Sequence, residues 1–250
     1  MTSARLHSPS LLLRALLTCG VAACSQGEAR SSAPAATSTT TTAANQTPAP
    51  STVAAAPAST DPAATDPMLE LADKGRTMGK ESAGVWLLVV SDFQCPWCKL
   101  WHDETFPSIK RDYVETGKLR VAYINFPLGI HPNAWPSAMA AMCASAQGKF
   151  WDAHDRIFGA QKAWEKLPKP EAFLDSLAIA AGAEPTRLRQ CTAKHETLAL
   201  IQADQARANK AGASTTPTFF IGGARIEGAE KFPLFKHVID SVLAASAKAK

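Results

Sequence analysis

Two cysteines separated by two residues are the side chains of this sequence best suited to chemistry. They occur in the run Cys95-Pro96-Trp97-Cys98, which follows a short apolar stretch and precedes residues that can form a helix. A Cys-x-x-Cys pair between a strand and a helix is typical of a redox site. There, one thiolate attacks a disulfide and the second thiol resolves the mixed disulfide. The motif therefore predicts thiol–disulfide exchange.

The expected local structure gives the two thiols different roles. Pro96 suits the first position of a helix, so Cys95 becomes the N-cap, where free N–H groups and the helix dipole favour an anion. This environment lowers the pKa of a thiol and predicts that Cys95 is the nucleophilic thiolate. Cys98 lies one turn inside the helix, should be less exposed, and can attack a mixed disulfide formed on Cys95.

Three other uses of such a pair can be compared with the sequence. A structural zinc site needs four ligands, usually from two Cys-x-x-Cys pairs, and this chain has one. Covalent attachment of haem needs a histidine directly after the second cysteine, where this chain has Lys99. A structural disulfide stays open, although a four-residue loop constrains the unfolded chain little. We therefore expect no metal ion and no cofactor.

The pattern of apolar residues indicates the elements that must hold the pair. The continuous apolar run Val85–Val90 is typical of a strand buried on both faces. The other expected elements are a helix from Pro96 to about Thr116 kinked at Pro107, a strand Leu119–Phe126, a helical stretch from about Ala134 to Gly212, a strand Thr218–Ile221, a hairpin through Gly222-Gly223 to Arg225-Ile226-Glu227, and a helix from about Phe232 to Ala247. This order describes an α/β fold with a central sheet and one large helical insertion.

The first 23 residues have the pattern of a secretory signal peptide. Arg5 and Arg14 flank a leucine-rich run that gives way to small residues. The run ends in Val-Ala-Ala-Cys, which resembles a bacterial lipobox and predicts that Cys24 becomes the lipid-modified first residue of the mature protein. The alternatives are an ordinary signal peptide cut near Ala23 and a start codon placed too early.

Residues 24–67 are expected to form a disordered tether. Of the 43 residues from 25 to 67, 34 are Ser, Thr, Ala or Pro, so this segment cannot bury enough apolar surface to offset its ordering entropy. Such a tether lets a domain reach away from a lipid anchor, although an unanchored tail without a role stays open. The folded domain is expected over residues 68–250.

The composition limits the classes of protein that fit. With 46% hydrophobic and 19% charged residues, the chain is not disordered throughout. No run of about 18 apolar residues is available to span a membrane. The net charge of +4 is not gathered into a block of like charge, so we expect no nucleic-acid partner.

Several motifs beyond the cysteine pair resemble the DsbA-like branch of the thioredoxin superfamily. They are Ser91-Asp92-Phe93-Gln94-Cys95-Pro96-Trp97-Cys98-Lys99, Asn125-Phe126-Pro127-Leu128, His131-Pro132-Asn133-Ala134, Gly148-Lys149-Phe150-Trp151-Asp152-Ala153-His154-Asp155 and Thr216-Pro217-Thr218-Phe219-Phe220-Ile221-Gly222. The resemblance covers nearly all of residues 80–245 and implies a thioredoxin fold with a helical insertion at about 131–212. It also implies that the peptide bond before Pro217 is cis and faces the redox pair. The substrate-binding residues that it implies are Pro96, Trp97, Thr216 and Pro217.

The sequence departs from this family at two positions near the thiols. The DsbA prototype and thioredoxins place a buried acid six residues before the first cysteine, where this chain has Val89. Asp92 is either the nearby substitute or a turn residue at the strand end. Strongly oxidising members have a histidine between the cysteines that helps to hold the thiolate, whereas Trp97 offers one N–H donor. We therefore expect a pKa of Cys95 between about 3.5, as in DsbA, and about 7, as in thioredoxin.

A second cysteine pair, Cys143 and Cys191, falls in expected helices of the insertion. Some DsbA-like proteins have a disulfide between the matching helices, and thiols in an oxidising compartment pair more often than they stay free. The resemblance therefore implies a structural disulfide, with two separately buried cysteines as the alternative. His131 is a candidate for the wall of the active-site groove, whereas His102 and His154 are expected in helix packing or at the surface.

Together these features predict an extracytoplasmic thiol–disulfide oxidoreductase in the periplasm of a Gram-negative-type cell envelope, held by lipid at Cys24. It would pass a Cys95–Cys98 disulfide to the thiols of secreted proteins and exchange electrons with a membrane or periplasmic redox partner. A reductase or isomerase of the same fold stays open, because direction depends on the reduction potential relative to the partner. A non-catalytic binding or chaperone module with a static disulfide is the alternative from another class.

Overall fold

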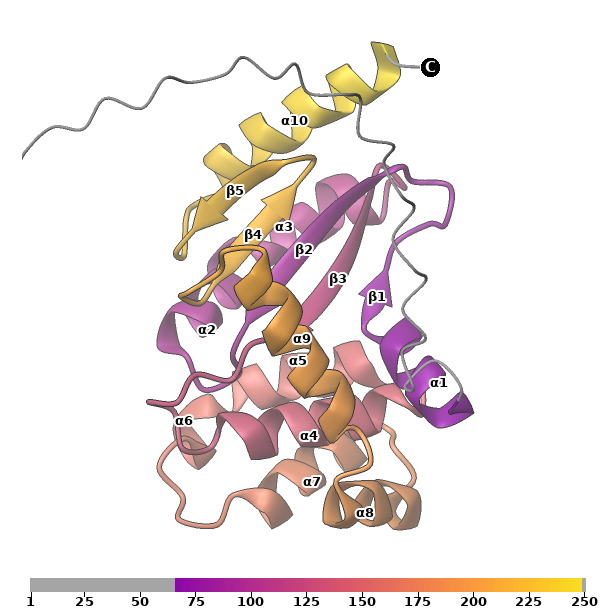
Figure 1. The fold of residues 1–250 in the computed structure, drawn as a ribbon, viewed down its shortest axis with the longest axis vertical. Coiled ribbons are helices and arrows are strands. Elements are labelled where there is room, and N and C mark those ends of the chain that lie inside the picture. The colour runs from indigo at the N-terminus through magenta and orange to yellow at the C-terminus, as the bar shows by residue number, and fades with distance from the viewer. Residues whose placement is uncertain (1–65, 249–250) are drawn as a thin grey trace, which may run out of the picture. The chain divides into compact units, whose positions relative to one another are not determined.

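The computed structural model describes residues 66–248, in which five strands form one mixed sheet (Figure 1). The strands are β1 (Thr77–Met78), β2 (Val85–Ser91), β3 (Leu119–Asn125), β4 (Thr218–Ile221) and β5 (Ala224–Glu227). Their order is β1-β3-β2-β4-β5, with β2 and β3 parallel and the other neighbours antiparallel. The predicted signal peptide, Cys24 and the predicted tether up to residue 65 lie outside the described residues.

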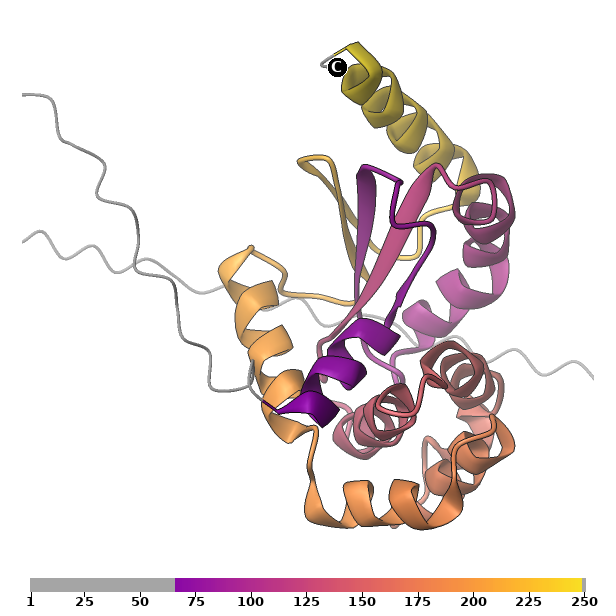
Figure 2. The same ribbon diagram turned by 90° about the vertical axis from the view of Figure 1, so that its right-hand side faces the viewer.

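Helices flank the sheet and build the insertion. Those beside the sheet are α1 (Pro67–Gly75), α2 (Pro96–Glu104), α3 (Phe106–Ile109), the π-helical segment η2 (Lys110–Val114), α9 (Leu198–Lys210) and α10 (Phe232–Lys248). Those of the insertion are α4 (Ala134–Ser145), α5 (Phe150–Gly159), α6 (Gln161–Trp164), α7 (Glu171–Ala180) and α8 (Pro185–Lys194). Figure 2 shows α9 on one side of the sheet and the α2–α3 segment on the other. Within residues 66–248, no helix has the length and apolar character that a membrane span requires.

The central strand β2 is buried because helices pack on both of its faces. Val85, Leu87 and Val89 lie in one apolar cluster with residues of α2, α3 and α10. Val90 belongs to a second cluster, with Ala208 of α9. Burial on both faces explains the continuous apolar sequence of this strand. The strand runs one residue beyond the predicted one, to Ser91.

The segment predicted as one kinked helix from Pro96 to Thr116 consists of three shorter ones. The first, α2, ends where the Thr105 N–H donates to the Trp101 carbonyl at 2.9 Å. Pro107 then lies in the first turn of α3, where its missing N–H costs no hydrogen bond. The chain continues as the π-helical η2. The proline therefore starts a new helix instead of bending the old one.

Two elements at the start of the domain, α1 and β1, do not follow from the apolar pattern. Asp66 caps α1 because its Oδ1 accepts a hydrogen bond of 2.8 Å from the Met68 N–H, and Pro67 lies in the first helical turn. The two residues of β1 pair with Ala122 and Val121 of β3. Helix therefore begins at the last residue of the predicted tether.

A buried ion pair connects the start of the domain to the sheet and to α9. Arg76, directly after α1, donates to the Asp204 carboxylate of α9 and, at 3.2 Å, to the Tyr123 carbonyl of β3. Asp204 also accepts from the backbone and side-chain amides of Asn125, at 3.0 and 2.9 Å. Removing one partner of such a pair leaves an uncompensated buried charge, which typically costs about 3–5 kcal/mol.

The helix α4 forms the centre of the insertion. Ten of its twelve residues are buried, half of them alanines, and α1, α5, α7 and α8 pack around it. Small side chains allow this close approach. At Gly75, the last residue of α1, an added Cβ would lie 2.5 Å from the Ser145 carbonyl oxygen. A glycine is therefore required where α1 meets the end of α4.

Candidate redox site

The turn after β2 places Cys95 at the start of α2. Cys95 has extended backbone angles (φ −67°, ψ 123°) and occupies the N-cap, with Pro96 in the first turn. Asp92 holds the turn: its carbonyl accepts from the Cys95 N–H at 3.1 Å, and its Oδ1 accepts from the Gln94 N–H at 2.8 Å. Both thiols of the pair are free, and Cys95 and Cys98 are 3% and 1% exposed.

The surroundings of Cys95 favour its thiolate. The pKa of Cys95 falls to about 6, first because its sulfur accepts a hydrogen bond from the Cys98 thiol. The Thr216 side chain and the N–H groups of Trp97 and Cys98 lower it further, while burial opposes the shift. This value lies within the range expected from the sequence. The N–H groups are those that the start of a helix leaves without partners.

The second thiol behaves in the opposite way. Burial raises the pKa of Cys98 well above its usual range, and the neighbouring Cys95 raises it further. The Asp92 N–H lies 3.5 Å from Cys98 Sγ and is the backbone donor that faces it. One thiolate and one thiol is the pairing that thiol–disulfide exchange needs, because the nucleophile must be ionised and the resolving sulfur must not compete with it.

An open groove of about 660 Å³ lies beside Cys95. Its walls come from residues 95–97, 128–131 and 214–216, so the predicted site residues Pro96, Trp97 and Thr216 line it together. Trp97 is 61% exposed and Ile130 80%, and they offer apolar surface to a ligand. Pro217 follows directly, and its peptide bond with Thr216 is cis, but it is not among the lining residues.

Asp92 is a turn residue whose carboxylate also forms a buried ion pair. Its Oδ2 lies 2.7 Å from His131 Nδ1 and accepts from the Leu128 N–H at 2.9 Å. His131 lines the groove, at the position that the sequence suggested as a candidate. The hydrogen bond to Asp92 raises the pKa of His131, and burial opposes it. The family's position for a buried acid holds Val89, a core residue of β2.

Amide side chains to which the sequence analysis assigned no role join the redox turn to the insertion. Gln161 Nε2 donates to the carbonyls of Phe93 and Cys95, at 2.7 and 3.1 Å. Gln94 Oε1 accepts from the Asn133 N–H at 2.6 Å. Their partners lie 39 to 68 positions away in the chain, so no local signal could have identified them.

A separate polar cluster joins α2 to α5. His102 Nε2 and His154 Nδ1 lie 3.0 and 2.8 Å from the same oxygen of Asp155. These distances are those of hydrogen bonds. His154 is buried among aromatic rings such as Phe93 and Phe158, and burial is the first cause that lowers its pKa to about 4. His154 is therefore a packing residue, in agreement with the sequence-based expectation.

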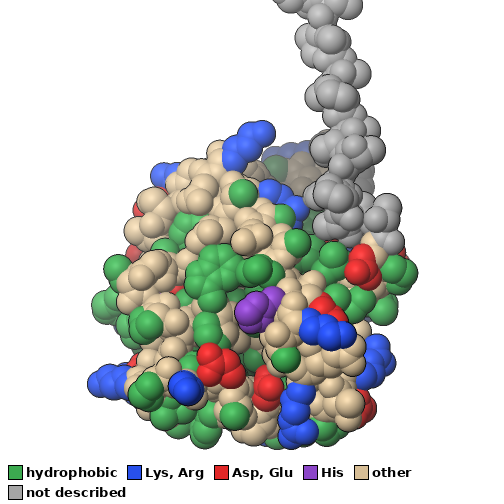
Figure 3. Space-filling model, turned by 60° about the horizontal axis from the view of Figure 1, so that its bottom comes forward, with side chains coloured by type: hydrophobic (Ala, Val, Ile, Leu, Met, Phe, Trp, Pro, Cys, Tyr) green, Lys and Arg blue, Asp and Glu red, His purple; other side chains and the backbone are tan. Residues whose placement is uncertain are grey.

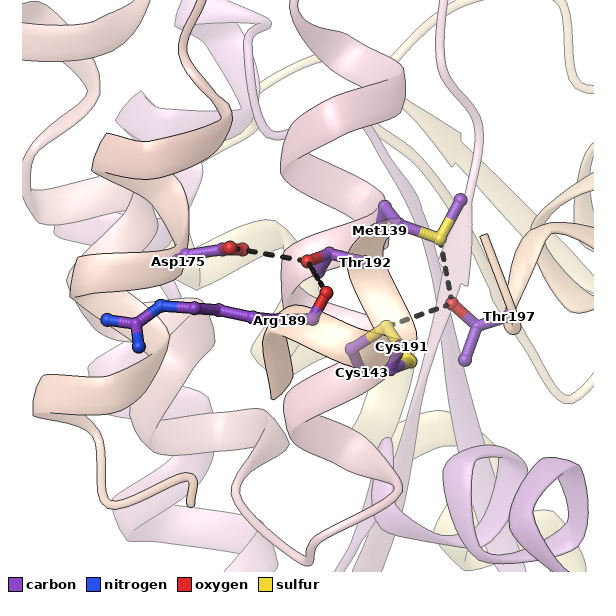
Figure 4. Close-up of a disulfide and its surroundings, with 7 residues drawn as sticks. All are labelled: Met139, Cys143, Asp175, Arg189, Cys191, Thr192 and Thr197. Atoms are coloured by element: carbon purple, nitrogen blue, oxygen red, sulfur yellow. Dashed lines mark hydrogen bonds between the residues drawn. A yellow bond between two sulfur atoms is a disulfide. The ribbon is translucent and has the colours of Figure 1, made fainter. Parts of the chain in front are cut away.

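A disulfide between Cys143 and Cys191 joins α4 to α8, with 5.8 Å between the Cα atoms (Figure 4). This is the pairing that the family resemblance implies. Thr197 Oγ1 lies 3.8 Å from Cys143 Sγ and donates to Met139 Sδ at 3.1 Å. Neither cysteine lines the groove beside Cys95. The bond therefore belongs to the packing of the insertion.

A second hollow, of about 330 Å³, lies among α4, α7, α8 and α9. Trp135, Met139, Leu198 and His195 line it, together with two acidic side chains. Figure 3 shows hydrophobic side chains gathered around a histidine on this end of the domain. No cysteine is among the residues that line this second hollow.

Known proteins share this fold. A family model described as thioredoxin matches residues 71–241. Disulfide bond formation protein D of Bacillus subtilis is 24% identical over 172 residues, which cover 66% of this chain and 76% of that protein. The Na⁺/H⁺ antiporter NhaA 3 of Salinispora tropica is 29% identical over 175 residues, 70% of this chain but 26% of the antiporter. The crystal structure of Wolbachia pipientis α-DsbA1 has a TM-score of 0.62 at 24% identity, and the match covers 70% of this chain and 94% of that one.

The chain belongs to the thioredoxin family. Within it, the fold is that of the DsbA-like proteins, in which a helical insertion lies between the parallel strands and the C-terminal hairpin of the sheet.

Proposed function

We propose that this protein is a thiol–disulfide oxidoreductase that introduces disulfides into exported proteins. The observation that carries the proposal is a thiol of pKa about 6 at the N-cap of α2, beside an open groove and above a buried partner thiol. The relatives named as disulfide bond formation proteins and protein-disulfide oxidoreductases support the same activity.

The exchange would proceed in two displacements. A substrate thiolate attacks Sγ of Cys95 in the oxidised protein, so that a mixed disulfide forms and the Cys95–Cys98 bond breaks. Cys98 leaves with the electron pair and takes up a proton, because burial raises its pKa. A second substrate thiolate then attacks the substrate sulfur of the mixed disulfide and releases Cys95 as a thiolate. Two electrons pass from the substrate to the protein.

The stability of the Cys95 thiolate favours this direction. A thiol of low pKa is a good leaving group, and a stabilised thiolate makes the reduced protein favourable, hence the disulfide oxidising. Each cycle leaves the protein reduced, so a partner carrying a disulfide or an equivalent two-electron oxidant must restore the Cys95–Cys98 bond. This partner is expected in the same compartment.

The decisive experiment mixes the oxidised protein with a reduced, unfolded substrate that has several cysteines. We expect one reduced Cys95–Cys98 pair, with two free thiols, to appear for each substrate disulfide that forms. The equilibrium with glutathione should favour the reduced protein. A reductase would show the opposite equilibrium. A binding module would slow aggregation of the substrate without any exchange.

We also propose that residues 1–23 direct export and that Cys24 carries lipid, so that residues 24–67 tether the domain within the cell envelope, in the periplasm. The lipobox-like Val-Ala-Ala-Cys sequence and the composition of the tether support this. Cys24→Ala, or inhibition of the lipoprotein signal peptidase, should leave the precursor uncleaved. Normal processing of Cys24→Ala to a released form would contradict lipidation.

A further inference from the structure

A histidine paired with a buried carboxylate lines the groove beside Cys95, although the central dipeptide provides no charged side chain. His131 and Cys95 line the same groove, from loops 36 residues apart in the chain. The imidazole is 15% exposed, and its Nδ1 lies 2.7 Å from a carboxylate oxygen of Asp92, which is fully buried. A buried carboxylate beside an imidazole favours the protonated ring, and this contact is the first cause of the raised pKa of His131.

The two residues of the pair lie near different sulfur atoms. Asp92 is buried and does not line the groove, and its backbone N–H lies 3.5 Å from Cys98 Sγ. Its carboxylate is held by the N–H groups of Gln94 and Leu128 as well as by His131. The imidazole, at the other end of the pair, is the part that lines the groove with Cys95. The imidazole therefore shares the groove with the nucleophilic sulfur, and the charge of Cys95 is one of the causes that raise the pKa of His131.

No other charge in the groove competes with this pair. Of the residues that line the groove, those of 128–130 and 214–216 have apolar or hydroxyl side chains or none, and Pro96 and Trp97 are uncharged. The titratable groups that act on His131 are Asp92 and Cys95. A single imidazolium in a partly buried groove interacts more strongly with a thiolate than it would in bulk water.

We propose that Asp92 and His131 form a positioning pair, in which Asp92 holds the imidazolium of His131 in the groove wall so that its charge stabilises the Cys95 thiolate. The inference rests on the proposed exchange at Cys95. The pair would supply from the loop after β3 the positive charge that the Pro-Trp dipeptide lacks. His131 acts through Cys95 and forms no bond with the substrate.

The first test replaces His131 with asparagine. The amide Nδ2 can still donate to Asp92, but the side chain carries no charge. We expect the pH midpoint of Cys95 alkylation to rise, and the equilibrium constant for reduction by glutathione to fall by about three- to tenfold, where tenfold corresponds to about 30 mV. His102→Asn is the matched control, because His102 is also 15% exposed and paired with an aspartate but does not line the groove.

A structural role of His131 would not depend on its charge. The wild type and His131→Asn should therefore differ less in their equilibrium constant with glutathione as pH rises through the raised pKa of His131. The difference should vanish where the ring is neutral. In Asp92→Asn the ring no longer has a carboxylate partner, so His131 should lose its proton, and its effect on Cys95, at a lower pH. This second variant tests the inference if His131→Asn does not fold.

Several outcomes would overturn the inference. The first is an unchanged pH midpoint of Cys95 alkylation in folded His131→Asn, and the second is an equal shift of this midpoint in His102→Asn. The third is a difference in the glutathione equilibrium between the wild type and His131→Asn that stays the same at high pH. The alkylation midpoint does not require exchange with protein substrates. If the wild type fails to oxidise substrates, the proposed function is wrong. If His131→Asn still raises the pH midpoint of Cys95 alkylation, the inference about His131 holds even then.

Discussion

The two cysteine pairs of this domain are equally buried, yet they lie at opposite ends of their helices. Cys95 and Cys98 occupy the start of α2, whereas Cys143 and Cys191 lie in the last turns of α4 and α8. Exposure does not distinguish them, since Cys191 is 5% exposed and Cys95 3%. Helix N-termini stabilise an anion and C-termini disfavour one. The position of each sulfur along its helix, more than its burial, therefore separates the redox pair from the structural pair.

The most direct test of the difference between the two cysteine pairs is to replace each cysteine of the redox pair in turn. We expect Cys95→Ser to abolish disulfide transfer. We expect Cys98→Ser to accumulate mixed disulfides on Cys95, because the neighbouring thiol that could attack Cys95 Sγ and release the adduct is gone. Non-reducing gels and peptide mapping would detect the adducts. If Cys98→Ser keeps full turnover and adducts form on Cys98 in Cys95→Ser instead, the roles are reversed.

Removing the other pair should affect stability and not exchange. The disulfide closes a loop of 48 residues, for which chain entropy gives at most about 4 kcal/mol. We expect the double variant Cys143→Ala with Cys191→Ala to lose up to this free energy of unfolding in urea, with substrate oxidation unchanged below the transition. A large fall in the exchange rate of the folded variant would show that the second pair takes part in the chemistry.

The order of reduction sharpens the same contrast. The Cys95–Cys98 bond borders an open groove and leaves a stabilised thiolate, whereas a buried structural disulfide has a lower potential. We expect mild dithiothreitol to reduce Cys95–Cys98 first and to leave Cys143–Cys191 intact. Alkylation at timed intervals followed by mass mapping would give the order. Simultaneous reduction of both bonds would contradict the distinction.

The last expected effect is a pH dependence of stability that belongs to the redox pair alone. The Cys95 pKa is about 6 in the folded protein and about 8.5 in an unfolded chain. A depressed thiol pKa stabilises the folded, reduced form above the unfolded value, and this contribution declines as pH falls towards 6. Urea titrations of reduced protein between pH 6 and 9, against Cys95→Ser as a control, should show it. If the free energy of unfolding changes with pH in the same way in both proteins, this contribution of Cys95 is excluded.

Local sequence signals predicted the parts of the site that lie close together in the chain. The apolar run of β2, the Pro96 start of α2 and the N-cap position of Cys95 all follow from neighbouring residues, and so does the hairpin of β4 and β5. The pairing of Cys143 with Cys191 came from family resemblance, because spacing alone does not select a partner.

Contacts between distant residues could not be predicted in the same way. Asp92 had two possible roles in the sequence, and only its meeting with His131, 39 residues later, shows that it holds an ion pair as well as a turn. The break of the helix at Thr105 was missed because a proline can either kink a helix or start a new one. The packing of α1 against α4 depends on a whole tertiary arrangement.

The buried Arg76 pair has a mechanical consequence. A pull on the chain at residue 66 would be transmitted along α1 to Arg76, and from there to Asp204 and the Tyr123 carbonyl. The load would thus reach α9 and β3, and the contact of Gly75 with the end of α4 would pass part of it to the insertion. Strand β2 and the turn that holds Cys95 come next on this route, because β3 pairs with β2 and Tyr123 stacks on Phe93. Strain applied where the tether would join the domain would therefore be shared among the sheet, α9 and the insertion before it reached the active thiol.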